Sequence, residues 1–283
     1  MLVLAIILVV LAALCAIWLL IIKGHTGNPL REQLDGALYA HRGYHSEPDA
    51  PENSREAFRR AVQRGFGAEL DVHLLRDGRL AVMHDSKLER MTGAAGEVED
   101  LTVEQLTQYT LGKSTETIPT LEEVLAIYQG RAPLIIELKT WHKNAAPLCE
   151  AVCRVLDGYT GLYCLESFDP RVVQWLKKNR PDIVRGQLTQ NFVKERSGLS
   201  LPLAVMGTCL LCNLFTRPDF IAYKYQDRHN LSNQACLHLW GVAGASWTLR
   251  SREELDTALR EGLWPIFENF DPEAAAPADA DSL

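Results

Sequence analysis

The sequence predicts an α/β protein of the TIM (β/α)8-barrel class, preceded by one N-terminal membrane helix. Three observations lead to this prediction. Residues 1–22 contain no charged or strongly polar side chain. Eight short apolar runs then alternate with helical segments over about 250 residues, which is typical of a barrel of parallel strands. Polar residues stand at the ends of several of these runs, where barrel enzymes keep their reactive groups.

The first segment is long enough to cross a membrane. Twenty-two helical residues extend roughly 33 Å, and the hydrocarbon core of a bilayer is about 30 Å thick. A secretory signal would have a basic start and a small-x-small cleavage site, and neither is present. Lys23 and Arg31 flank only the C-terminal side, so the positive-inside rule predicts that the large domain after it lies in the cytoplasm. We therefore expect a single-pass cell-membrane protein that contacts the lipid bilayer through residues 2–22.

Charge and cysteine content narrow the functional class. The 283 residues carry 29 Lys and Arg against 36 Asp and Glu, a net charge of −7 without a basic run, so no nucleic-acid partner is expected. A zinc site at Cys209, Cys212, Cys236 and His238 is conceivable, but zinc ribbons normally show a second close cysteine pair. We expect most of the seven cysteines to act as small hydrophobic residues.

Hydropathy and charge divide the chain into four parts. They are a helix at 1–22, a polar linker at 23–36, a barrel at 37–270 and an acidic tail at 271–283, which is expected to be disordered. The eight runs are 38–41, 68–73, 134–138, 162–166, 183–187, 219–223, 244–248 and 264–268. A further run at 79–83 follows the turn pair Asp77-Gly78 and predicts a small β-hairpin insertion after strand two.

Capping residues mark several helices between the strands. Ser54, Thr120 and Ser251 each precede a helical pattern with Glu close behind, as N-cap residues do. These patterns end at glycines, the residue preferred after a helix: Gly65, Gly130 and Gly262. Residues 189–218 fit the alternation poorly, and we expect an irregular excursion there.

Carboxylates gather at the ends of strands two and three. Glu69 and Asp71 are two residues apart, so both leave the same face of a strand, and Glu137 and Lys139 are related in the same way. Three converging carboxylates stay ionised together only beside a compensating cation. Their hard oxygen atoms suit Mg²⁺ or Ca²⁺ better than zinc. Alone, the Glu69 and Asp71 pair would indicate a solvent-facing strand edge, and Lys139 an ordinary surface lysine or a salt bridge to Glu137.

Histidines complete the group. His41 ends the first strand and His84 ends the hairpin strand, so both can reach one pocket. Either one alone would be read as a hydrogen-bonded core histidine. Their combination with the carboxylates favours catalysis, because histidine exchanges protons near neutral pH. His73, two residues beyond Asp71, is the nearest rival for a catalytic role.

The order of these motifs resembles that of the glycerophosphodiester phosphodiesterases, of the membrane-anchored bacterial type. The shared motifs are HRG at 41–43, PENS at 51–54, ELDVHLLRDG at 69–78, VMHD at 82–85, IELK at 136–139, ESF at 166–168 and SWT at 246–248. The resemblance implies a TIM barrel that hydrolyses glycerophosphodiesters to glycerol 3-phosphate and an alcohol. It also implies that the neighbouring glycerol hydroxyl attacks phosphorus, and that water then opens the cyclic phosphate.

The resemblance assigns a role to each chemical position. It implies a metal site at Glu69, Asp71 and Glu137 for one divalent cation, Mg²⁺ or Ca²⁺. It implies His41 and His84 as the acid/base pair, Arg42 and Lys139 as the phosphate clamp, and Glu52 and Trp247 in the substrate pocket. In these roles the cation would polarise the phosphoryl group, and the basic side chains would hold the phosphate in line.

Departures from the family pattern leave the substrate open. Ser54 replaces the usual Thr, the seventh-strand motif reads Trp247-Thr248-Leu249-Arg250, and the last strand ends Ile266-Phe267-Glu268-Asn269. One alternative is therefore a lysophospholipase D that cleaves lysophospholipids at the membrane, with the apolar residues around 199–215 in contact with lipid. Another is a catalytically silent, membrane-anchored barrel used for binding or regulation. It is disfavoured because every chemical position is filled.

Overall fold

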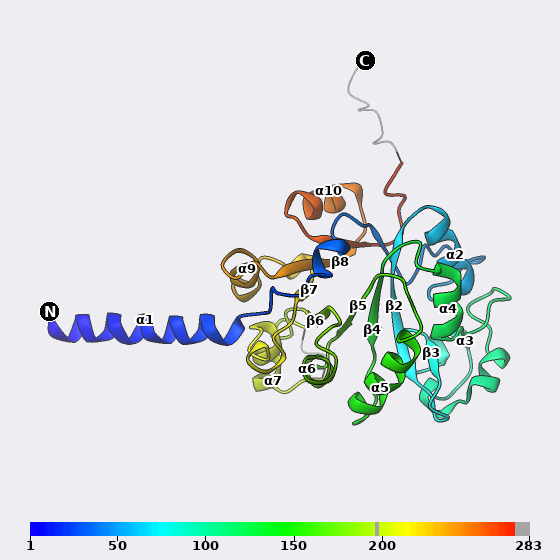
Figure 1. Cartoon of the computed structure of the whole chain (residues 1–283), viewed down its shortest axis with the longest axis horizontal. Coiled ribbons are helices and arrows are strands. Elements are labelled where there is room, and N and C mark those ends of the chain that lie inside the picture. The colour runs from blue at the N-terminus through cyan, green and yellow to red at the C-terminus, as the bar shows by residue number, and fades with distance from the viewer. Residues whose placement is uncertain (196–197, 275–283) are drawn as a thin grey trace, which may run out of the picture.

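Eight parallel strands form a closed barrel in the computed structural model, which describes residues 1–195 and 198–274 (Figure 1). The barrel strands are β1 (Tyr39–His41), β2 (Gly67–Leu74), β4 (Leu134–Leu138), β5 (Tyr163–Ser167), β6 (Arg185–Thr189), β7 (Phe220–Lys224), β8 (Ala243–Leu249) and β9 (Trp264–Phe267). Strand β1 pairs with both β2 and β9, and this pairing closes the barrel. The predicted fold class and all eight predicted strands are confirmed.

The predicted hairpin insertion is also present. Strand β3 (Leu80–Val82) runs antiparallel to β2. The chain that follows contains α3 (Glu89–Thr92), η2 (Val98–Asp100) and η3 (Val103–Gln108) before it returns to the barrel. A small apolar core of its own, which includes Met83, Leu88, Val98 and Leu106, holds this insertion together.

Helices surround the barrel between successive strands. They are α2 (Arg55–Gln63), α4 (Leu121–Tyr128), α5 (Ala145–Leu156), α6 (Pro170–Asn179), α9 (Leu231–His238) and α10 (Arg252–Arg260). Ser54, Thr120 and Ser251 each accept a hydrogen bond from the backbone N–H three residues later, as the sequence predicts. These caps satisfy amide groups that have no partner within the helix.

Alternation along each strand separates an apolar face from a polar one. On β2, Ala68, Leu70 and Val72 face the helices and join the main core. Glu69, Asp71 and His73 alternate with them and are also buried. The apolar floor of the barrel interior includes Tyr39, Ile135, Cys164, Phe220 and Trp264. Polar side chains therefore lie within the barrel mouth, above this floor.

Helix α1 (Leu2–Ile22) projects from one side of the barrel (Figure 1). Its mean hydropathy of 3.3 and its 21-residue length are sufficient for a membrane span. The predicted linker contains η1 (Arg31–Leu34), whose Leu34 is fully buried. The excursion at 189–218 contains α7 (Leu201–Thr208) and α8 (Asn213–Thr216), and η4 (Tyr225–Asp227) follows β7.

The predicted tail begins at residue 271, and its residues 275–283 lie outside the described residues. Of the earlier part, Asp271 and Glu273 form ion pairs with Arg64, both at 2.8 Å.

Candidate active site

Strands β2 and β4 bring the three predicted carboxylates together. Asp71 and Glu137 are paired in the sheet register, and Glu69 lies two residues before Asp71 on the same face. One oxygen atom from each carboxylate lies within 4.8 Å of the others, and all three side chains are buried. The sequence reasoning therefore identified a true cluster in space.

A fourth buried carboxylate adjoins this cluster. Glu166 on β5 is paired in register with Glu137, so its side chain leaves the same face of the sheet. Its Oε2 atom finds no hydrogen-bond partner among the described residues. Burial and Glu137 raise the pKa of Glu166 well above its ordinary value. Glu166 belongs to the ESF motif at 166–168, but the sequence alone does not predict a role for it.

The ionisation of these carboxylates is strongly unequal. Burial and the neighbouring Asp71 raise the pKa of Glu69, and burial raises that of Glu137 to about 7 although Lys139 opposes it. Burial also works against ionisation of Asp71, but Lys139, His84 and Arg42 hold its pKa below the usual range. A divalent cation bound through the carboxylate oxygens would offset the mutual repulsion of these buried carboxylates, so the cluster fits such a cation.

Basic groups lie beside the carboxylates. Lys139 Nζ is 2.9 Å from both Asp71 Oδ1 and Glu137 Oε2. Arg42 donates its backbone N–H to Glu69 Oε2 at 3.2 Å, and its Nε lies 3.5 Å from Asp71 Oδ2. Both side chains predicted to hold phosphate therefore border the acidic cluster, where they already form ion pairs.

Glu52 and Asn53 support this arrangement from the loop before α2. Glu52, which the sequence assigned to the substrate pocket, accepts hydrogen bonds from Arg42 at 2.8 Å and from Arg90 at 2.6 Å. Asn53 donates to Asp71 Oδ2 at 2.8 Å, a contact that the sequence reasoning missed. The loop thus holds both Arg42 and Asp71 in place.

His41 is oriented by a carboxylate from the opposite end of the chain. Its Nδ1 lies 2.5 Å from Glu268 Oε2, and its Nε2 lies 3.8 Å from Glu69 Oε2. Arg250 binds the other oxygen of Glu268 at 2.6 Å. Burial lowers the pKa of His41, against the opposing effect of Glu268. The sequence reasoning noted Glu268 only as a departure from the family pattern.

His84 has a similar partner. Its Nδ1 lies 2.6 Å from Asp85 Oδ1, and Arg90 binds the other Asp85 oxygen. Burial lowers the pKa of His84 to about 4, against the opposing charge of Asp71, so the ring is neutral near pH 7. Each predicted catalytic histidine therefore directs Nδ1 at a carboxylate and leaves Nε2 for other contacts.

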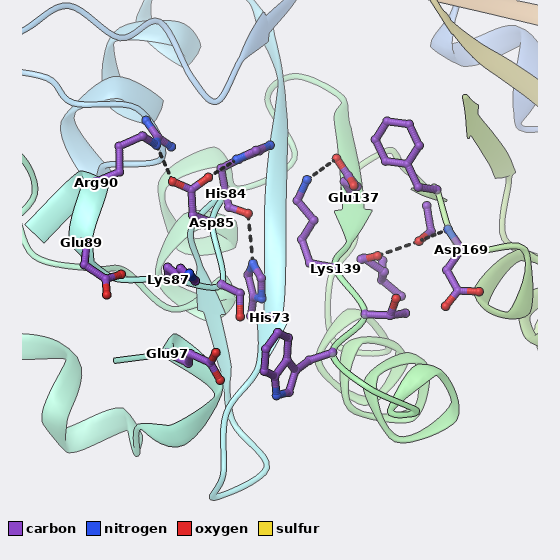
Figure 2. Close-up of a pocket in the computed structure, with 16 residues that line it drawn as sticks. His73, His84, Asp85, Lys87, Glu89, Arg90, Glu97, Glu137, Lys139 and Asp169 are labelled. Carbon is purple, nitrogen blue, oxygen red and sulfur yellow. Dashed lines mark hydrogen bonds and ion pairs between the residues drawn. The ribbon is translucent and has the colours of Figure 1, made fainter. Parts of the chain in front are cut away.

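The rival His73 uses both ring nitrogens within the protein. Its Nδ1 lies 2.6 Å from Glu99 Oε1. Its Nε2 lies 3.3 Å from the carbonyl oxygen of His84, the contact drawn as a dashed line in Figure 2. Ser86 donates to the second Glu99 oxygen at 2.6 Å. This buried network holds the backbone that carries His84.

Three hollows meet at the barrel mouth. The innermost, of about 160 Å³, is lined by predicted site residues: His41, Arg42, Glu69, His84, Glu137 and Trp247. A wider cleft of about 850 Å³ adjoins it, with His84, Glu137 and Lys139 at the inner end and Lys87, Glu89 and Glu97 farther out (Figure 2). An apolar groove of about 590 Å³ shares Phe168 and Leu188 with the innermost hollow.

Trp247 lines the innermost hollow. Its indole Nε1 donates to the Ala222 carbonyl at 3.2 Å, and its ring packs edge-on against Phe168 at 5.7 Å. The structure does not support the zinc site considered at Cys209, Cys212, Cys236 and His238. Cys212 contacts Gln187, and Cys236 contacts the Ile22 carbonyl. Within residues 1–195 and 198–274, the acidic triad is the one cluster with the spacing of metal ligands.

Several known proteins are similar to this chain. The model of the glycerophosphoryl diester phosphodiesterase family matches residues 41–270. A glycerophosphodiester phosphodiesterase of Bacillus altitudinis is 42% identical over 109 residues, which cover 36% of this chain and 44% of that protein. One of Caldanaerobacter subterraneus is 33% identical over 163 residues, which cover 54% of this chain and 66% of that protein. The chain thus aligns with about half to two-thirds of the length of these relatives.

Solved structures share the barrel. A phosphodiesterase of Oleispira antarctica, solved with the product sn-glycerol-3-phosphate, superimposes with a TM-score of 0.68 at 22% identity. The superposition covers 84% of this chain and 94% of that one. At this identity the likeness establishes a common fold.

Proposed function

Because the chain belongs to the glycerophosphoryl diester phosphodiesterase family, we propose that it hydrolyses glycerophosphodiesters to glycerol 3-phosphate and an alcohol. The observation that supports this proposal most is that two carboxylates of the acidic triad, Glu69 and Glu137, line one hollow of about 160 Å³ together with two histidines and Arg42. Electrostatic and acid/base groups for phosphodiester cleavage are then within reach of one bound phosphate.

The acidic triad would hold the cation. Glu69, Asp71 and Glu137 offer only carboxylate oxygens, which suit Mg²⁺ or Ca²⁺. When bound there, the cation would polarise the phosphoryl group and offset the charge of the transition state. Arg42 and Lys139, which already border the triad, would orient the phosphate and add positive charge.

The histidines would move the protons. In the first step, one histidine removes the proton of the neighbouring glycerol hydroxyl, whose oxygen attacks phosphorus. The other histidine donates a proton to the departing alcohol oxygen as the P–O bond breaks. In the second step, the histidine that acted as acid removes a proton from water, whose oxygen attacks phosphorus. The ring P–O bond to the attacking glycerol oxygen breaks, and the other histidine returns a proton to that oxygen, which gives glycerol 3-phosphate. His41 and His84 suit this cycle because a carboxylate fixes each ring at Nδ1.

Release of glycerol 3-phosphate from a panel of glycerophosphodiesters tests the proposal. Activity should require Mg²⁺ or Ca²⁺ and disappear in excess chelator. Glu137→Gln should weaken metal binding and activity together, whereas Glu122→Gln, in an exposed ion pair with Arg79, should change neither. Full turnover in chelator would rule out the metal-dependent mechanism. Binding of diesters without any turnover would instead favour the silent binding barrel.

Lysophospholipids are the second candidate substrate, because of the apolar groove. Leu203, Met206 and Phe192 line it, and it meets the innermost hollow at Phe168. A single acyl chain could lie there while the phosphate occupies the site. Leu203→Glu should then lower turnover of lysophospholipids and leave that of glycerophosphocholine unchanged. Equal losses on both substrates would exclude an acyl-binding role for the groove.

We also propose that α1 crosses the cell membrane and that the barrel faces the cytoplasm. The apolar length of α1 supports the span, and Lys23 and Arg31 after it support the orientation. Protease added to sealed inside-out vesicles should digest the barrel, whereas protease added to right-side-out vesicles should not. The reverse result would overturn the orientation.

A further inference from the structure

The C-terminal end of α1 is joined to the barrel by hydrogen bonds. The last carbonyl groups of a helix have no partner within the helix and must bind elsewhere. Here side chains of the barrel supply the donors: Trp240 Nε1 to the Leu19 carbonyl (3.0 Å), Arg217 Nη1 to those of Leu20 (2.9 Å) and Lys23 (2.6 Å), and Asn213 Nδ2 to that of Ile22 (2.8 Å). The helix therefore ends on the barrel surface.

Apolar packing fixes the same junction. Ile22 is fully buried in a cluster with Leu210, Ile221, Cys236 and Val242, and Trp18 packs against it from the preceding turn. The chain then continues in contact with the barrel, because His25 Nδ1 lies 2.5 Å from the buried Asp219. A flexible tether between helix and barrel is absent from this part of the described chain.

The barrel surface around this junction is unusually apolar. Apart from Met1 and α1, nine of the eleven exposed large hydrophobic residues that the structure describes fall within 193–239. This segment contains α7, α8 and α9, and α1 contacts the last two of them. Figure 1 shows α7 and α9 near the C-terminal end of α1. We call its most exposed members on these helices and their ends the apolar collar: Leu201, Leu203, Leu214, Phe215, Leu231 and Leu239.

Basic and aromatic groups accompany the collar. Lys23 Nζ lies 4.9 Å from the centre of the Trp240 ring, and Lys177 Nζ donates to the Phe215 carbonyl at 2.8 Å. Arg217 stands at the same junction. Tryptophan prefers the boundary between hydrocarbon and water, and lysine and arginine there attract anionic head groups. The basic, aromatic and apolar groups of this surface are thus complementary to an anionic bilayer surface.

We infer that α1 stays on the mature protein as a rigid part of the barrel and holds the apolar collar against an anionic bilayer, so that the barrel docks on the membrane in one orientation. The collar would insert its side chains at the level of the head groups while α1 continues into the hydrocarbon. This inference rests on α1 entering the membrane and is independent of the proposed catalytic activity.

Spin labels on the full-length chain test the inference in vesicles of phosphatidylcholine and phosphatidylserine. Cysteine would be introduced by Phe215→Cys or Leu239→Cys in the collar, with Cys15 and Cys209 replaced by Ala to prevent their labelling. Ala126→Cys on α4 is the matched control, because Ala126 is exposed on a helix far from α1 (Figure 1). Collar labels should be more accessible to oxygen than to an aqueous nickel chelate, and the control label should show the reverse.

Two results would overturn the inference. One is equal access of the aqueous chelate to all three labels, which is the behaviour of a barrel on a loose tether. The other is a mature chain that begins after residue 22, found by mass spectrometry of membranes.

Arg217→Ala should raise chelate access at Leu239→Cys while the α4 label stays unchanged, which separates loss of docking from loss of folding. None of these measurements needs turnover, so a failed catalytic proposal leaves them valid.

Discussion

His41 and His84 are alike in one detail: a carboxylate holds Nδ1 of each ring, Glu268 for the first and Asp85 for the second. A charged partner at Nδ1 fixes the tautomer and stabilises the ring when it accepts a proton. The two partners are themselves fixed by arginines, Arg250 and Arg90. In the proposed mechanism, proton transfer at each histidine would therefore depend on a carboxylate and an arginine behind the ring.

Loss of either histidine should remove most of the activity. His41→Ala and His84→Ala should each lower kcat by about 10²–10⁴, the usual contribution of a positioned acid or base. The double variant should be little worse than the poorer single one, because the pair acts as a unit. An activated aryl diester needs no acid and should partly rescue one of the two. Harmless His84→Ala together with inactive His73→Ala would show that the pair is wrongly assigned.

Glu268→Gln tests the positioning of His41. The amide cannot stabilise a charged ring, so kcat should fall by at least about 10², with little change in KM. The Glu268 carboxylate raises the pKa of His41, because it favours the protonated ring. The limb of the pH–rate profile that reports His41 should therefore move to lower pH in the Gln variant. Glu268→Asp should recover part of the rate. An unchanged pH profile would mean that Glu268 has only a structural role.

At the scale of elements, the insertion after β2 supports the site through a buried pair. Glu99 on η2 and His73 on β2 link the insertion to the barrel, and His73 contacts the backbone of His84. Burial works against ionisation of Glu99, but the hydrogen bond from His73 lowers its pKa. Glu99 therefore stabilises the fold above its unfolded pKa of about 4.3, and this contribution is lost as pH falls through the lower, folded pKa.

Glu99→Gln should lower the free energy of unfolding by about 1–3 kcal/mol near neutral pH, because it weakens a buried charged hydrogen bond. The difference from the unmodified chain should shrink as pH falls below about 4. Urea unfolding at several pH values measures both effects. A difference that stayed constant with pH would show that the Glu99 charge does not stabilise the fold.

The elements were predictable where local signals agreed. Each barrel strand is an apolar run, and Ser54, Thr120 and Ser251 start helices by chemistry that lies within four residues. The acidic triad was predictable because Glu69 and Asp71 share a strand face. Partners such as Glu268 were not, because 227 residues separate it from His41 and only closure of the barrel joins them. Residues 189–218 lacked periodicity, so α7 and α8 were missed.

For the whole molecule, α1 is part of the fold as well as a candidate anchor. A chain that starts at residue 31 would expose the cluster around Ile22 and leave Asn213 and Arg217 without the carbonyls that they bind. Burial of one large aliphatic side chain contributes about 1.5–3 kcal/mol, so Tm should fall by at least about 3 °C. A chain that starts at residue 16 keeps the junction and is the control. Equal Tm values in detergent would contradict this role.

Closure of the barrel has a consequence for synthesis. Strand β1 cannot pair with β9 until β9 has been synthesised, and His41 cannot bind Glu268 before then either. At 5–20 residues per second, a ribosome needs roughly 10–45 s to travel between these two residues. During that time the strands that carry the acidic triad already exist, but the barrel is still open and His41 lacks its carboxylate partner. In the proposed mechanism, chains that stop before β9 would therefore be inactive, because the site is complete only when the last tenth of the chain has been made.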